Sequence, residues 1–174
     1  MQYNLSPETL VGVQPKNMGV ENYLNEKFNL QWAKDKNVTV APNGSMYRRD
    51  KQGFLPELME KMYGDRVVFK KKTIEAKKEF QKTKDPIYKN EISRCNNIQM
   101  AKKIALNSAY GAIGNQYFRY FDVRIAEAIT LGGQLSIRWV ERDVNKFMNK
   151  LLNTDNVNYV VASDTDSILS LIHI

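Results

Sequence analysis

Residues 157–171, VNYVVASDTDSILSL, predict a β-hairpin with two aspartates at its tip. Apolar runs rich in Val, Ile and Tyr flank a short polar cluster, which is the pattern of strand, turn and strand. If the backbone stays extended through the tip, Asp164 and Asp166 point to the same side. Two carboxylates that face one way repel each other unless a cation lies between them, and Mg2+ prefers oxygen ligands of this kind. The stretch therefore predicts half of a divalent metal site, although a D-x-D tip alone is more often a solvated turn.

The composition is that of an ordinary globular protein. With 174 residues, 43% hydrophobic and 26% charged, the chain is long enough for one domain, or for one domain and part of another. Its apolar runs are too short to cross a membrane, and its first residues show no secretion signal. Cys95 and His173 are the only residues of their kinds, which excludes an internal disulfide and a Cys/His zinc site and fits a reducing compartment.

The net charge of +7 is concentrated in one quarter of the chain. Residues 61–103 carry 13 Lys or Arg against 5 Asp or Glu, whereas the remaining residues carry 13 against 14. A basic block of this kind indicates a polyanionic partner, either nucleic acid or nucleotide phosphates. A pair of solvated, lysine-rich helices would have the same composition, so charge alone leaves both interpretations open.

The pattern of apolar residues and caps predicts the main elements. Residues 6–9 predict a helix start, because Ser, Pro and Glu follow one another in the order of an N-terminal cap. An Asn-Gly pair predicts a β-hairpin near 38–50. Two long helices are expected at 56–84 and about 90–114, as an antiparallel pair, and a third at 122–152.

The second of these helices carries a polar stripe. The stripe consists of Lys103, Asn107, Tyr110 and Gly114. Residues at this spacing lie on one side of a helix, and a core stripe would be apolar. On the preceding helix, Arg66 and Lys70 are four residues apart and also share a face. These residues predict a surface against which a flat, charged ligand lies, and the alternative is an exposed helix face that includes a tyrosine by chance.

Two motifs resemble those of family B DNA polymerases. Residues 103–111, KIALNSAYG, match the family's K-x-x-x-N-S-x-Y-G fingers motif, and residues 162–167, ASDTDS, resemble its Y-G-D-T-D-S palm motif. The order and separation of the two also agree, and the pair is far more specific than either motif alone. Further matches at 4–9, 41–47 and 114–120 extend the resemblance to the replicative polymerases of T-even-type tailed phages.

The resemblance implies an α+β, helix-rich internal piece of a larger enzyme. Residues 1–54 would be a palm segment with the hairpin near 38–50, residues 55–115 an inserted two-helix fingers arm, and residues 116–174 a palm helix and the truncated D-T-D-S hairpin. The family's D-x-x-S-L-Y-P-S motif, which supplies another metal-binding aspartate, would precede residue 1. The 174 residues alone are therefore expected to extend no primer.

The resemblance also assigns roles to the matching positions. Asp166 would be a metal ligand and Asp164 a neighbour that tunes the metal site, which makes these two the catalytic candidates. Two Mg2+ ions, with Mn2+ as an alternative, would promote nucleotidyl transfer to a primer 3′ end. The residues that would contact the triphosphate of the incoming nucleotide are Arg66, Lys70 and Lys103. Those that would lie against the new base pair are Asn107, Tyr110 and Gly111.

The implied partners are primer–template DNA and deoxynucleoside triphosphates, with a sliding clamp and other replisome proteins for the whole enzyme. The implied location is the cytoplasm of a phage-infected bacterium. One departure from the family is Ala162-Ser163, where Tyr-Gly is usual. Two other functions remain open from the residues themselves. One is a non-catalytic basic helical DNA-binding module, and the other is a nucleotide-sugar transferase, which would not account for the polar stripe.

Overall fold

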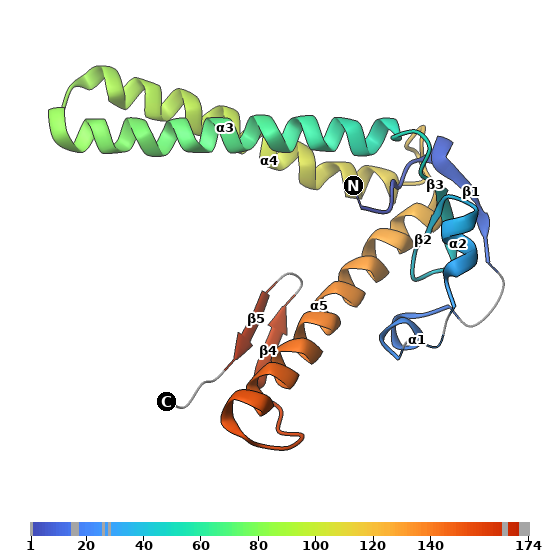
Figure 1. The fold of residues 1–174 in the computed structure, drawn as a ribbon. Helices are drawn as coiled ribbons and strands as arrows, with labels where there is room; N and C mark the ends of the chain where they lie inside the picture. The colour runs from blue at the N-terminus through green and yellow to red at the C-terminus, as the bar shows by residue number, and fades with distance from the viewer. Residues whose placement is uncertain (1, 15–17, 26, 28, 165–166, 171–174) are drawn as a thin grey trace. The chain divides into compact units, whose positions relative to one another are not determined.

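The computed structural model describes all residues except 1, 15–17, 26, 28, 165–166 and 171–174 (Figure 1). The chain divides into two compact units, residues 1–9 with 51–123 and residues 10–50 with 124–174. Long helices and two small antiparallel sheets make up the described residues. The predicted helix-rich α+β fold class is therefore confirmed at this level.

The first unit is a helical arm of two antiparallel helices, α3 (Phe54–Thr83) and α4 (Pro86–Ile113), which lie side by side (Figure 1). The helices pack through residues three and four apart, with Thr73 and Ala76 of α3 and Cys95 of α4 buried. At the far end the chain reverses through Lys84, which has a left-handed φ of 56°. The second helix begins four residues earlier than predicted, because the Asp85 side chain accepts a hydrogen bond from the Ile87 N–H at 2.9 Å and caps it.

The base of the arm is tied to residues 4–9. The backbone N–H groups of Gly53, the N-cap of α3, and of Phe54, its first residue, donate to the side chains of Asn4 (2.8 Å) and Glu8 (2.6 Å). A Cβ atom added to Gly53 would lie 2.5 Å from the Ser6 Cβ, so only glycine allows this approach. Side chains of residues 4–9 therefore accept hydrogen bonds from N–H groups at the start of α3 that have no partner within the helix.

The prediction of a helix that starts at residue 6 is wrong. Pro7–Thr9 form one 3-10 turn (η1), after which β1 (Leu10–Val13) continues in extended conformation. This strand pairs with β3 (Ser45–Arg48), and β3 also pairs with β2 (Val38–Val40), all antiparallel. Backbone pairing with β3 outweighs the local capping pattern.

The hairpin predicted near 38–50 is present in the second unit as β2 and β3. Gly44 supplies the positive φ of 85° that its turn requires. Two short helices, α1 (Val20–Leu24) and α2 (Gln31–Asp35), precede it. Val40, Ala41 and Tyr47 provide the buried centre of this region.

The rest of the second unit comprises α5 (Val123–Leu152) and an antiparallel hairpin of β4 (Val160–Asp164) and β5 (Ser167–Ser170). Both the long helix and the two antiparallel strands follow the prediction. The register pairs Asp164, the last residue of β4, with Ser167, the first residue of β5. Residues 165–166 lie outside the described residues.

Candidate functional site

An ion pair shows which residues of α3 and α4 lie level along the arm. The Nζ atom of Lys102 on α4 lies 2.7 Å from the Oδ2 atom of Asp65 on α3, so these two residues are level along the arm. Arg66 and Lys103 each follow one member of this pair in sequence. Since one residue advances a helix by only about 1.5 Å, Arg66 and Lys103 also lie within one helical turn of each other along the axis.

The same ion pair defines two faces of the arm. One step along a helix rotates a side chain by about 100°. Because α3 and α4 run in opposite directions, the steps from Asp65 to Arg66 and from Lys102 to Lys103 rotate in opposite senses when viewed from one end. The side chains of Asp65 and Lys102 point towards each other, since they form the ion pair. Opposite rotations from these two positions therefore bring Arg66 and Lys103 to the same side of the arm, away from the ion pair. We name the side that carries Arg66 and Lys103 the cationic face, and the side that carries Asp65 and Lys102 the paired face.

Lys70 belongs to the cationic face as well, because it lies one helical turn beyond Arg66. Lys70 and Lys103 are exposed, and Arg66 is half-buried. None of the three side chains forms an ion pair or hydrogen bond with any residue that the structure describes. The Nε atom of Arg66 is buried and has no hydrogen-bond partner there, and no described residue bonds to the other N–H groups of the guanidinium, which therefore stay free for an anion.

The remaining predicted residues of α4 continue the cationic face towards the base of the arm. Asn107 and Tyr110 follow Lys103 at i+4 and i+7, and both are exposed, Tyr110 by 47%. A Cβ atom added to Gly111 would meet no atom within 4 Å. Nothing inside the arm thus requires this glycine, and its effect is to leave the helix backbone open to a close approach.

The carboxylate candidates belong to the other unit. Asp164 is exposed at the end of β4, and its backbone carbonyl accepts a hydrogen bond from the Ser167 Oγ at 3.3 Å. Asp166, the predicted metal ligand, lies outside the described residues. Across the part of the chain that the structure describes, no group of three or more His, Cys, Asp or Glu residues is placed to hold a metal ion. The hard oxygen donors of Asp164 suit a divalent ion, but they provide only one residue of such a site.

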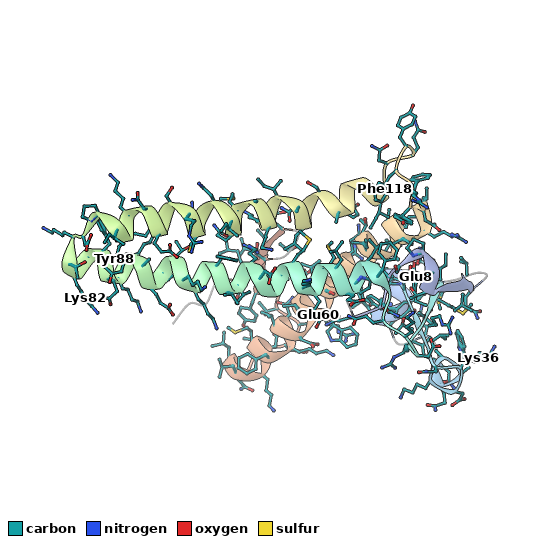
Figure 2. The ribbon with its side chains drawn as sticks, turned by 90° about the horizontal axis from the view of Figure 1, so that it is seen from above. Glu8, Lys36, Glu60, Lys82, Tyr88 and Phe118 are labelled. Carbon is teal, nitrogen blue, oxygen red and sulfur yellow. The ribbon has the colours of Figure 1, made fainter. Side chains whose placement is uncertain are left out.

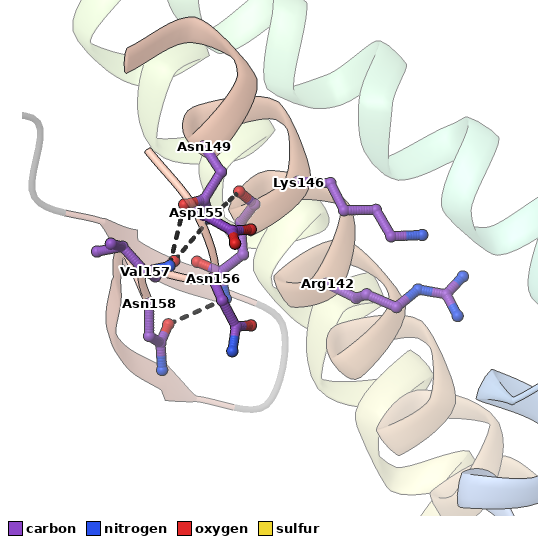
Figure 3. Close-up of a pocket in the computed structure, with 8 residues that line it drawn as sticks. Arg142, Lys146, Asn149, Asp155, Asn156, Val157 and Asn158 are labelled. Carbon is purple, nitrogen blue, oxygen red and sulfur yellow. Dashed lines mark hydrogen bonds between the residues drawn. The ribbon is translucent and has the colours of Figure 1, made fainter. Parts of the chain in front are cut away.

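Two asparagines of α5 hold the segment that leads into β4 (Figure 3). The amide of Asn149 bonds both backbone groups of Val157, donating to its carbonyl at 2.8 Å and accepting from its N–H at 3.0 Å. One turn earlier, Asn145 accepts from the Tyr159 N–H at 2.8 Å and donates to the Asn158 side chain at 2.9 Å. These residues, which were not predicted, set the start of the strand that ends in Asp164.

A cavity of about 820 Å³ lies beside these asparagines. Figure 3 shows its lining residues, which are Arg142, Asn145, Lys146, Asn149 and 155–158. The cavity is at the beginning of β4, whereas Asp164 is at the end, four residues or roughly 13 Å away along the strand. It is therefore separate from Asp164.

Comparison with known proteins decides the family. A family model described as DNA polymerase family B matches residues 1–174. The chain belongs to DNA polymerase family B. It is 30% identical to the DNA-directed DNA polymerase of Enterobacteria phage T4 and 28% identical to that of Escherichia phage RB69, and both alignments cover 96% of this chain. The predicted resemblance to T-even-type phage polymerases is confirmed.

More distant family B polymerases match over the same region. The catalytic subunit of DNA polymerase delta from Drosophila melanogaster is 26% identical over 97% of this chain. A solved structure of the family B DNA polymerase from Pyrobaculum calidifontis matches with a TM-score of 0.57 and 26% identity, covering 97% of this chain and 18% of the archaeal one. The chain spans 23% of the length of the two phage relatives.

Two further observations concern this family B chain. Ala162 and Ser163, at the position of the family's usual Tyr-Gly, are both exposed and pair with Leu169 and Ile168 in the hairpin. The replacement thus leaves the strand pairing beside Asp164 intact. Among the described residues, no helix combines the length and the apolar character needed to span a membrane.

Proposed function

We propose that this chain is the fingers and the later part of the palm of a DNA-templated DNA polymerase, which adds deoxynucleotides to a primer 3′ end. In this proposal α3 and α4 are the fingers, and the β4–β5 hairpin is the catalytic part of the palm. The observation that carries it is the cationic face, where Arg66, Lys70 and Lys103 lie together without carboxylate partners among the described residues.

The spacing of these cations suits a nucleoside triphosphate. Lys103 is close to level with Arg66, and Lys70 lies about 6 Å further along the axis of α3. Long Arg and Lys side chains from two helices can then converge on a group that carries three to four negative charges. Cations placed in this way stabilise the charge that develops on the phosphoryl groups during transfer.

The order of residues along the arm also gives the nucleotide a direction. Gly111, Tyr110 and Asn107 lie towards the base of the arm, and the three cations follow outward. With its base against Tyr110 and the open backbone of Gly111, the nucleotide would extend its phosphates outward. The exposed phenol and the bare backbone would then test the shape of the new base pair.

Asp164 and Asp166 would hold divalent metal ions, with Mg2+ the expected ion and Mn2+ an alternative. Ions bound there would lower the pKa of the primer 3′-hydroxyl and stabilise the attacking and leaving oxygens. The role of this chain would be to present the carboxylate of Asp164 at the end of β4. The amides of Asn145 and Asn149 hold the start of that strand.

The whole protein would act on primer–template DNA and deoxynucleoside triphosphates, with a sliding clamp and other replisome proteins as further partners. The similarity to the T4 and RB69 enzymes supports action in the cytoplasm of an infected bacterium. The isolated 174 residues would extend no primer, since the family's other metal-binding aspartate is not among them.

The decisive experiment changes Asp164→Ala together with Asp166→Ala in the intact polymerase that carries this sequence. We expect primer extension to fall by roughly 10³-fold or more, with the affinity for primer–template DNA largely kept. Extension at the wild-type rate would contradict the proposal. It would favour a non-catalytic basic DNA-binding module, whose function does not depend on these carboxylates.

A further inference from the structure

The cationic face continues outward beyond the three proposed triphosphate contacts. Lys77 follows Arg66 by eleven residues, and Lys89 precedes Lys103 by fourteen, so each lies within about 40° of that residue around its own helix. Lys77 is twelve residues beyond Asp65, and Lys89 is thirteen residues before Lys102. In antiparallel helices these offsets bring Lys77 and Lys89 level with each other, on the same face as Arg66.

The carboxylates of this outer half of the arm point elsewhere. Glu79 pairs with Lys82 at 2.8 Å and Glu91 pairs with Arg94 at 3.0 Å. Figure 2 shows Lys82 at the far end of the arm. Glu75, the remaining carboxylate of α3 and α4 beyond Arg66, is two residues or about 200° from Lys77.

Lys77 and Lys89 are both exposed and have no ion-pair or hydrogen-bond partner in the described part of the chain. The carboxylates of the outer arm thus lie away from the cationic face, while lysines without an ion pair to any described residue also occur elsewhere on α3, among them Lys71, Lys72 and Lys78. What distinguishes the cationic face is that none of the carboxylates of the outer arm lies on it, among the residues that the structure describes.

The distance along the arm shows what these two lysines can contact. Lys77 lies seven residues, or about 11 Å, beyond Lys70. If the nucleotide is seated as proposed above, with its base towards Tyr110, Lys77 and Lys89 lie beyond its terminal phosphate. They are on the side from which phosphates would arrive and leave.

We infer that Lys77 and Lys89 form an outer polyphosphate-binding position on the cationic face. It captures the triphosphate of an incoming nucleotide before Arg66, Lys70 and Lys103 do, or receives the departing pyrophosphate. This inference rests on the proposed function. Clusters of one charge raise the local concentration of an oppositely charged ligand and its rate of association, and salt weakens the effect.

A polyphosphate suits this position better than a nucleic-acid strand. Proteins that bind single strands combine cations with exposed aromatic side chains on which bases stack. The aromatic side chains of the outer arm are Phe69, Phe80 and Tyr88, and all three are half-buried. The exposed Tyr63 and Tyr110 lie towards the base of the arm.

The test is Lys77→Gln with Lys89→Gln in the intact polymerase, because glutamine removes the charge and keeps a good helix former. The matched control is Lys82→Gln with Arg94→Gln, which also removes one cation from each helix, but from pairs with Glu79 and Glu91. We expect kcat/KM for the nucleotide to fall three- to tenfold at about 50 mM salt and less than twofold at about 0.5 M. The kcat at saturating nucleotide should stay unchanged. The control should change kcat/KM by less than twofold, and Lys77→Arg with Lys89→Arg should restore it.

Two further measurements identify the source of the polyphosphate. A rise in the KM for pyrophosphate in the reverse reaction, together with the loss for the nucleotide, shows that entry and exit share the position. A loss confined to the nucleotide shows that only entry uses it. Weaker binding of primer–template with a long template overhang, and an unchanged kcat/KM for the nucleotide, would overturn the inference in favour of a DNA strand.

Equal effects of the test and control variants, or none, would also overturn the inference. The proposed function fails in a different way, through a wild-type protein that extends no primer or a Lys103→Ala variant that behaves like wild type. A polymerase that is sensitive to Lys103→Ala and indifferent to the Lys77 and Lys89 changes would contradict the outer position alone.

Discussion

The helical arm and the β4–β5 hairpin present their polar residues in different ways. The arm is built of helices of 30 and 28 residues whose periodicity alone places Arg66, Lys70 and Lys103 on one side. The hairpin strands have five and four residues, and the start of β4 is held by hydrogen bonds from Asn145 and Asn149 of α5. A long regular element can display a binding surface unaided, whereas a short exposed hairpin depends on side chains from another element.

The largest effect should separate the two faces of the arm. Lys103→Ala should lower kcat/KM for the nucleotide by about 10²-fold in the intact polymerase, because an unpaired cation that contacts the triphosphate is lost. Lys102→Ala, which breaks the ion pair with Asp65 on the other face, should lower it by less than about threefold. Steady-state kinetics with varied nucleotide would measure both values. Similar losses in the two variants would mean that the faces are not functionally distinct.

The second effect concerns how the arm is anchored. Gly53→Ala should destabilise the chain by about 1–3 kcal/mol, because the added methyl group would lie 2.5 Å from the Ser6 Cβ. Gly64→Ala, inside α3 with no atom within 4 Å of the added group, should stabilise it by up to about 1 kcal/mol. Urea unfolding followed by circular dichroism measures both free energies. A neutral Gly53→Ala would show that residues 4–9 move aside easily.

The third effect tests whether the hairpin depends on α5. Asn149→Ala removes both hydrogen bonds to the Val157 backbone and should cost about 1–2 kcal/mol locally. Amide hydrogen exchange at Val157 and Tyr159 should then become roughly tenfold faster. The control is Asn96→Ala on the arm, where the side chain only accepts a bond from Gln99 at 3.0 Å. Unchanged exchange at Val157 would mean that the strand holds its place without α5.

The smallest expected effect is a pH dependence of the folding stability, which comes from Glu91 on the paired face. Hydrogen bonds from Arg94, and then from Cys95, lower the pKa of Glu91 from 4.5 to about 2. Because the unfolded chain takes up this proton first, the contribution of Glu91 is complete above about pH 4.5 and is lost as the pH falls towards 2. Glu91→Gln should reduce the fall in melting temperature over this range, whereas Glu75→Gln should not. The effect at pH 7 should be small, since the Glu91–Arg94 pair is exposed.

Much of the fold was predictable from local sequence. Helix-start and charge patterns predicted the first arm helix, apolar periodicity predicted α5, and turn and strand patterns predicted both hairpins, since these signals are local in sequence. The segment at residues 6–9 misled, because its capping pattern is real but serves the start of α3 rather than a helix of its own. Strand β1 had no recognisable signal, since four residues that include a glycine depend on pairing with β3.

The residues of the candidate site also separate into those that local sequence could predict and those that depend on distant contacts. Lys103, Asn107 and Tyr110 could be grouped from spacing, because a helix repeats every 3.6 residues whatever surrounds it. Asn145 and Asn149 could not be found, since nothing in an i, i+4 pair of asparagines predicts which distant backbone it will bind. The Asp65–Lys102 pair, which shows the register of the two helices, likewise joins residues 37 positions apart.

The sequence by itself determined which residue types occur, the helices that carry them and, through two motifs, the polymerase family. Only the tertiary structure decided that cations from α3 and α4 share one face while the acids pair on the other. The reason is that helix periodicity fixes angles within one helix, whereas the register between two helices depends on contacts that close when the chain folds back on itself.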